Sequence, residues 1–170
     1  MGNCGVSLRK CGGGGGSGGG NDMRDVELVN ADNSVALFSL AGETHVAKVV
    51  NIYDGDTCKI VIKMGGRLVK FTCRMNGYDC PEMKPSKDKK NRDKEIAAAK
   101  AAKGKLIELV GGEEQLVFAK CGKFDKYGRL LVDMYVDNPI SGNVKSVNQM
   151  MMDEGHGYSY DGGTKKVLYK

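Results

Sequence analysis

Residues 45–74 read HVAKVVNIYDGDTCKIVIKMGGRLVKFTCR, and this stretch decides the fold. It holds three runs rich in Val, Ile and other β-forming residues, at 45–53, 57–64 and 68–74. The runs are separated by Asp54-Gly55 and Gly65-Gly66, and both dipeptides are typical of the turns that close β-hairpins. The stretch therefore predicts three consecutive strands joined by tight turns.

A helix, two more strands and a short helix are predicted after this stretch. Apolar residues recur at helical spacing from Asp93 to Val110, and Gly111-Gly112 ends the run. Residues 115–120 and 129–136 alternate as strands do, and 146–154 has the composition of a short helix capped by Ser146. This order suits an α+β, mainly β fold: a five-stranded barrel of the oligonucleotide-binding (OB) type with one amphipathic helix and a short second helix.

The beginning of the chain cannot join a core, because residues 12–20 are all glycine apart from Ser17. Glycine-rich linkers behave as random coils. Either the segment 23–42, with its apolar run at 35–40, supplies substitute packing for the domain, or the domain is only marginally stable. The expected organisation is a disordered head and linker at 1–22, an extension at 23–44, a folded domain at 45–162 and a tail at 163–170.

The first residues, Met1-Gly2-Asn3-Cys4, resemble a signal for lipid attachment. Removal of Met1 would expose the amine of Gly2 for myristoylation, and Cys4 is a candidate for palmitoylation. The sixth residue is Val6, where the usual pattern has Ser or Thr. Either the head is a lipid anchor, which two acyl chains would make stable, or it is a plain disordered tail.

Charge and cysteine content limit the class of protein. The formal net charge is +5, and residues 84–105 alone carry nine basic against three acidic side chains. Such an excess attracts nucleic acid or an anionic membrane surface, or it is simply a solvated helix face. The six cysteines include no Cys-x-x-Cys pair, and no secretory signal is present. We therefore expect free thiols, no structural zinc, and an intracellular protein that a lipidated head would hold at the cytoplasmic face of a membrane.

Three short motifs carry the candidate chemistry: YDGDT at 53–57, RMNGYDCPE at 74–82 and DKYGR at 125–129. Each alone has an ordinary explanation, either a hairpin turn or a surface salt bridge. Their order, spacing and strand context together resemble the staphylococcal nuclease family. Val147-Asn148 and Gly155 extend the resemblance, so that it covers about two-thirds of the chain.

The resemblance implies a calcium site in which Asp56 and Asp79 are carboxylate ligands and the main-chain carbonyl of Cys80 is a third. Oxygen donors of this kind suit a hard cation. Asp54 would act through water. The family commonly has threonine at the position of Cys80, so any hydrogen bond from that hydroxyl is in doubt.

The resemblance also implies how substrate is held and cut. Arg74 and Arg129 would grip the phosphate with their planar guanidinium groups, and Glu82 would act as general base or orient the attacking water. The family's contacts to a terminal phosphate fall on Lys126 and Tyr127. Two further tyrosines, Tyr158 and Tyr160, either stack on a base or are ordinary core or surface residues.

The function implied is that of a calcium-dependent endonuclease, a phosphodiesterase that cuts DNA and RNA and leaves 3′-phosphate products. The alternative is a non-catalytic OB-type module that binds nucleic acid or a protein partner. The chain keeps the five residues at the centre of the site together, which favours the enzyme. They are Asp56, Arg74, Asp79, Glu82 and Arg129. The family's further C-terminal helix is expected to be missing, because only ten residues follow Tyr160.

Overall fold

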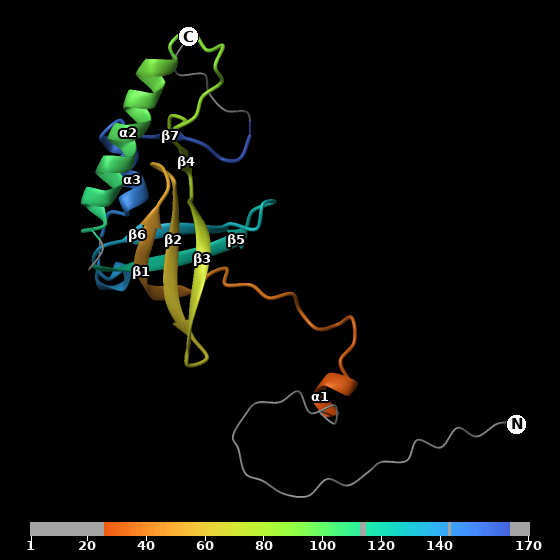
Figure 1. Cartoon of the computed structure of the whole chain (residues 1–170). Coiled ribbons are helices and arrows are strands. Elements are labelled where there is room, and N and C mark those ends of the chain that lie inside the picture. The colour runs from red at the N-terminus through yellow and green to blue at the C-terminus, as the bar shows by residue number, and fades with distance from the viewer. Residues whose placement is uncertain (1–25, 113–114, 143, 164–170) are drawn as a thin grey trace, which may run out of the picture. The chain divides into compact units, whose positions relative to one another are not determined.

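The structure is a computed structural model that describes residues 26–112, 115–142 and 144–163. The chain divides into two compact units, residues 1–37 and 38–170 (Figure 1). In the first unit, the described residues form one short exposed helix, α1 (Val26–Val29), which the sequence had not indicated. The lipidation candidates Gly2 and Cys4 lie outside the described residues.

The second unit is built on a closed five-stranded barrel with the strand order β1-β2-β3-β6-β5. Neighbouring strands are antiparallel, except that β3 and β6 run parallel. This confirms the predicted mainly β barrel. The strands are β1 (Thr44–Ile52), β2 (Thr57–Met64), β3 (Arg67–Met75), β5 (Leu116–Phe124) and β6 (Leu130–Tyr135).

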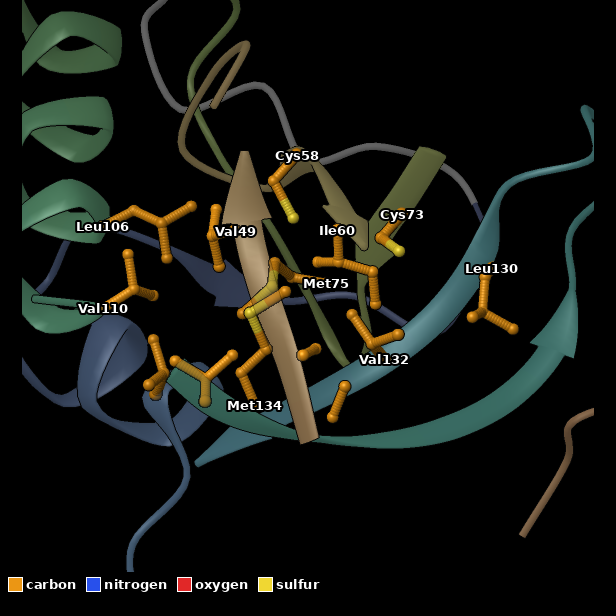
Figure 2. Close-up of a cluster of buried hydrophobic side chains, with 14 of the residues drawn as sticks. Val49, Cys58, Ile60, Cys73, Met75, Leu106, Val110, Leu130, Val132 and Met134 are labelled. Atoms are coloured by element: carbon orange, nitrogen blue, oxygen red, sulfur yellow. The ribbon is translucent and has the colours of Figure 1, made fainter. Parts of the chain in front are cut away.

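The core fills the barrel because apolar residues alternate along each strand and point inward. On β2, for example, Cys58, Ile60 and Ile62 are almost fully buried, while Lys59 and Lys63 are exposed. The helix α2 (Arg92–Leu109) adds Leu106, and Val110 follows at its end. Figure 2 shows these two side chains directed towards the same cluster as the residues of the strands.

The helix α3 (Val147–Asp153) is fastened to the barrel by one buried amide. The Asn148 side chain accepts a hydrogen bond from the Met134 amide at 3.0 Å and donates to the carbonyls of Asn76 and Val132 at 2.9 and 3.0 Å. Ser146 caps the helix, as predicted, by accepting from the Gln149 amide at 3.1 Å. Asn148 therefore holds the end of β3 against β6 and α3.

Two strands of only two residues each were missed by the sequence. The pair β4 (Tyr78–Asp79) and β7 (Tyr158–Ser159) is antiparallel, with Tyr78 opposite Ser159 and Asp79 opposite Tyr158. Figure 1 shows the two strands together beyond the end of the barrel. A short 3-10 helix, η1 (Pro139–Ser141), lies between β6 and α3 in the chain. The small β4–β7 pair is important because it brings the C-terminal tyrosines to the site described below.

The last part of the N-terminal extension packs on the barrel. Leu40 is buried, and the Phe38 ring lies 6.3 Å from that of Phe124. The amide of Gly42 donates to the carbonyl of Cys121, whose own amide donates to Glu43, both at 2.8 Å. Of the apolar run at 35–40, only these two side chains supply packing, since Val35 and Leu37 are exposed.

The cysteines and the helices of the described residues bear on the remaining expectations. The four cysteines within the described ranges, Cys58, Cys73, Cys80 and Cys121, are buried free thiols, as expected. Among the described residues no helix follows α3 in the sequence. None of the helices in these ranges is both long and apolar enough to cross a membrane.

Candidate active site

Three turns at one end of the barrel bring the sequence motifs together. They are the β1–β2 turn with Asp56, the segment from the end of β3 through β4, and the β5–β6 hairpin. The antiparallel register of β2 and β3 places Thr57 opposite Arg74. Asp56 therefore reaches Arg74 directly, although 17 residues separate them in the chain.

The centre of the site is one guanidinium between two carboxylates. Arg74 forms an ion pair with Asp56 and a second ion pair with Asp79, where Nη2 lies 2.5 Å from Oδ1. The same nitrogen donates to the Tyr78 carbonyl at 3.3 Å. All three charged residues are buried, with 9% of Arg74, 4% of Asp56 and 1% of Asp79 exposed. Buried charges of this kind are stable only when they are paired.

Further donors fix the orientation of each carboxylate. Asp56 accepts from the Thr57 hydroxyl at 2.8 Å and from the Cys80 amide at 3.2 Å. Asp79 accepts from the Tyr158 hydroxyl at 2.6 Å, a contact that the β4–β7 pairing creates. The Asp54 carboxylate accepts from the Asp56 amide at 3.3 Å and so closes the β1–β2 turn. The two central carboxylates are therefore held by donors from separate parts of the chain.

The two carboxylates differ in how well their charge is stabilised. Burial raises the pKa of Asp56 to about 7, although the charge of Arg74 acts in the opposite direction. Burial also acts to raise the pKa of Asp79, but hydrogen bonds from Tyr158 and Arg74 outweigh it and hold that pKa below its usual range. Two carboxylates thus share one guanidinium, and the negative charge on Asp56 is incompletely compensated.

The donor atoms at this centre are carboxylate and carbonyl oxygens, the type that calcium prefers. The carboxylates of Asp56 and Asp79 converge on the Arg74 guanidinium, and the amide of Cys80 contacts Asp56. Within the described ranges no cluster of three or more His, Cys, Asp or Glu side chains is placed to hold a metal. A calcium ion here would therefore depend on two carboxylates, carbonyl oxygen and water.

The Cys80 side chain forms a hydrogen bond although it lacks the hydroxyl of threonine. Its thiol donates to the carbonyl of His156, with the two atoms 3.2 Å apart. Burial, together with the charge of Asp56, raises the pKa of the thiol, so the neutral donor form prevails. The thiol also leaves no room for a side chain at Gly55, because a Cβ added there would lie 2.7 Å from the Cys80 sulfur. The glycine of the Asp-Gly-Asp turn is thus required by packing.

A cleft of about 850 Å³ opens beside this centre, and its lining holds three basic residues, three tyrosines and the two aspartates Asp125 and Asp161. Asp56, Asp79 and Glu82 are not part of its lining, whereas Arg74 is. Arg74 therefore joins the carboxylate pair to the cleft. The predicted substrate-binding residues that line the cleft are Arg74, Lys126, Tyr127, Arg129 and Tyr160.

Asp125, which the sequence did not single out, positions the second arginine. Its Oδ2 accepts from Arg129 Nε at 2.8 Å, and its Oδ1 accepts from the amides of Arg129 and Tyr127 at 2.9 and 2.8 Å. The Arg129 guanidinium lies 5.4 Å from the centre of the Tyr127 ring. An aspartate at the start of a four-residue turn is the sequence signal that could have indicated this role.

Glu82 follows β4 by three residues and has an exposed side chain. Its amide donates to the carboxylate of buried Glu95 at 3.4 Å. Burial and the hydrogen bond to Asp79 raise the pKa of Tyr158, and the charge of Glu82 contributes to the same effect. The side chain of Glu82 is therefore accessible to water, and its charge acts on Tyr158.

The two C-terminal tyrosines occupy different positions. Tyr160 lines the cleft, and the centre of its ring lies 5.8 Å from the Arg74 guanidinium. Tyr158 is instead engaged with Asp79 through its hydroxyl. Tyr160 thus contributes to the cleft, while Tyr158 supports a carboxylate.

Comparison with known proteins identifies the family of this chain. The family described as staphylococcal nuclease homologue matches residues 72–167, which include Arg74, Asp79, Glu82 and Arg129. Endonuclease YncB of Bacillus subtilis (strain 168) is 30% identical over 177 residues, an alignment that covers 95% of this chain and 77% of that protein. The chain belongs to the staphylococcal nuclease family.

Proposed function

We propose that this protein is a calcium-dependent nuclease that hydrolyses phosphodiester bonds in DNA and RNA and leaves 3′-phosphate products. Its family and its relative, named as an endonuclease, support the nuclease activity itself. The observation that carries the finer proposal is the pair of buried carboxylates, Asp56 and Asp79, that converge on Arg74 at the edge of a basic cleft.

The phosphate is proposed to bind between Arg74 and Arg129. Both guanidinium groups belong to the cleft, and a planar guanidinium can hold two phosphate oxygens at once. A calcium ion held by Asp56, Asp79 and the Cys80 carbonyl would add positive charge at the phosphate oxygens. Lys126 and Tyr127 would contact a neighbouring terminal phosphate, and Tyr160 would contact a base.

The proposed reaction is a single displacement at phosphorus. A bond forms between a water oxygen and phosphorus while the bond from phosphorus to the 5′ oxygen breaks. Glu82 accepts the proton of the water, and the 5′ oxygen leaves and is protonated from solvent. Arg74 and Arg129 neutralise the negative charge that develops on the remaining phosphate oxygens.

Little base specificity is expected from this site. The basic groups that line the cleft, Arg74, Lys126 and Arg129, would contact phosphate, and phosphate contacts carry no sequence information. An aromatic ring such as that of Tyr160 stacks on any base.

The test is cleavage of single-stranded DNA and of RNA with calcium or with a chelator. We expect calcium-dependent cleavage by the wild type, 3′-phosphate ends on the products, and strong loss in Glu82→Gln and Arg129→Ala. Glu108→Gln is a matched control, because Glu108 is an exposed glutamate of α2 paired with Lys105. Intact substrate in every reaction with folded protein would contradict the proposal and favour a non-catalytic binding module.

Membrane attachment is a separate proposal that rests on the Met1-Gly2-Asn3-Cys4 sequence. Acyl groups on Gly2 and Cys4 would hold the nuclease at the cytoplasmic face of a membrane. Mass spectrometry of the protein from its own cells tests this, and unmodified Gly2 and Cys4 would exclude it.

A further inference from the structure

The outer face of the β2–β3 hairpin carries an isolated group of lysines. Lys59 and Lys63 on β2 and Lys70 on β3 are exposed, and neither strand contains an aspartate or glutamate. These three side chains define what we call the lysine face. Cys58, Ile60 and Ile62, which alternate with the two lysines of β2, are buried in the core. The alternation therefore fixes the lysines on the outer surface of the barrel.

Strand register makes the lysine face continuous with the active site. Arg74 pairs with Thr57, and the next outward positions pair Lys59 with Thr72, Val61 with Lys70 and Lys63 with Leu68. Successive outward positions on a strand are about 7 Å apart, so the face extends about 20 Å from Arg74. It thus begins at the residue that joins the carboxylate pair to the cleft.

These lysines have no acidic partners among the residues that the structure describes. Ion pairs elsewhere in the barrel unit use other lysines, such as Lys89 with Glu95, Lys105 with Glu154 and Lys145 with Asp153. Arg67, at the tip of the hairpin, is also exposed and adds to the positive charge. A run of basic groups without carboxylates is complementary to a polyanion.

We propose that the lysine face binds the backbone of a single-stranded nucleic acid whose scissile phosphate lies in the cleft. This inference rests on the proposed nuclease function, and it adds a binding track that favours long polymers over short ones. Leu68 is 78% exposed and lies opposite Lys63. Such an apolar group beside the lysines suits a strand whose bases and sugars are accessible, as they are when unpaired.

The first test measures binding to a labelled single strand longer than the roughly 16 nucleotides that one OB fold can cover. A chelator keeps the strand intact, and affinity is recorded from low to high salt. Each lost phosphate contact should reduce the slope of log K against log[salt] by about 0.7. For K59Q/K63Q/K70Q we expect a slope about 2 units shallower, so that raising the salt fourfold weakens wild-type binding about 20-fold more than variant binding.

The matched control is K120Q/K123Q/K145Q, which removes the same charge from exposed positions on β5 and in the segment before α3. We expect its salt slope to stay near that of the wild type. Thermal unfolding of all three proteins checks that they are folded. Equal slopes for the two triple variants would overturn the proposal, because binding would then depend on net charge and not on this face.

The second test compares cleavage of the long strand with cleavage of a dinucleotide. We expect the lysine-face variant to lose at least ten times more activity on the long strand than on the dinucleotide. If wild-type protein cuts neither substrate but binding still depends on the lysine face, the proposed function fails, and only the part of the inference that concerns strand binding at the lysine face stands. Vesicles of phosphatidylserine and phosphatidylcholine test whether the lysine face binds an anionic membrane surface instead. Vesicle binding that requires these lysines, with DNA binding that does not, would assign the face to a membrane and overturn the proposal.

Discussion

Asp125 and Arg129 show how the geometry of the site depends on a single side chain. Three donors converge on the Asp125 carboxylate, and one of them is the Nε of Arg129. The outer nitrogens of the guanidinium are then left for a phosphate. Asp125 is thus a positioning residue that acts through Arg129.

The substitution Asp125→Asn should lower kcat/KM by roughly 10–100-fold, the equivalent of one charge-assisted hydrogen bond of about 1.5–3 kcal/mol. Steady-state kinetics on single-stranded DNA would measure it. In an Arg129→Ala background the same substitution should have little further effect. Additive losses in this double-mutant cycle would show that Asp125 acts independently of Arg129. Asp137→Asn, at an exposed aspartate after β6, is the control.

The same residue gives a prediction about pH. Burial acts to raise the pKa of Asp125, but hydrogen bonds from Arg129 and Tyr127 outweigh it and lower that pKa below the usual 3.8. The unfolded chain therefore binds a proton more readily, so Asp125 stabilises the fold above pH about 4 and loses this effect as the pH falls through its folded pKa. The difference in unfolding free energy between wild type and Asp125→Asn should be constant from neutral pH to about pH 4 and shrink below it. Denaturant titrations at several pH values would reveal a constant difference if this assignment is wrong.

Among the elements, the β4–β7 pair positions a contact of the site although each of its strands has only two residues. Its register places the Tyr158 hydroxyl 2.6 Å from Asp79. Tyr158→Phe should reduce stability by about 1–3 kcal/mol, because a buried carboxylate loses a hydrogen bond. Chemical denaturation would measure this loss. Tyr160→Phe is the matched control, since the Tyr160 hydroxyl donates to the Gly163 carbonyl at an exposed position. Equal effects of the two substitutions would mean that the contact to Asp79 contributes nothing.

Two glycines, one in a turn and one in a helix, should respond oppositely to alanine. At Gly55 a new Cβ would meet the Cys80 sulfur at 2.7 Å and the Ala102 Cβ at 2.8 Å, so Gly55→Ala should cost about 1–3 kcal/mol. At Gly104, inside α2, a Cβ meets nothing within 4 Å, so Gly104→Ala should stabilise the protein by about 0.5–1 kcal/mol. Thermal unfolding compares the two, and a stabilising Gly55→Ala would contradict the packing described.

The five barrel strands and two helices were predictable because each has a periodic pattern of apolar residues. The β4–β7 pair and α1 were not, since two to four residues show no period. For the site, the motifs indicated which residues meet, and the β2–β3 register explains how Asp56 and Arg74 do so. The contacts of Tyr158 with Asp79 and of Cys80 with His156 could not be predicted. Both join residues more than 70 positions apart, and no local pattern specifies such contacts.

For the whole molecule, the proposed calcium site would link metal binding to stability. Asp56 and Asp79 lie on different segments, one before β2 and one in β4, and they meet only when the barrel has formed. A calcium ion that binds both carboxylates would bind the folded state and not the unfolded chain. Calcium should therefore stabilise the fold by mass action, by about 2.7 kcal/mol at a concentration 100 times its Kd.

The expected result is a Tm that rises with calcium concentration and returns to its starting value with chelator. Asp79→Asn should reduce or abolish the rise, whereas Asp137→Asn, at an exposed aspartate far along the chain from both carboxylates, should keep it. Magnesium should have a smaller effect, because it demands near-octahedral geometry and gives up its water reluctantly. This readout does not depend on catalysis, so it separates metal binding from chemistry. A Tm that is the same with calcium and with chelator, in protein that cuts DNA, would show that the carboxylate pair works through Arg74 and not through a metal.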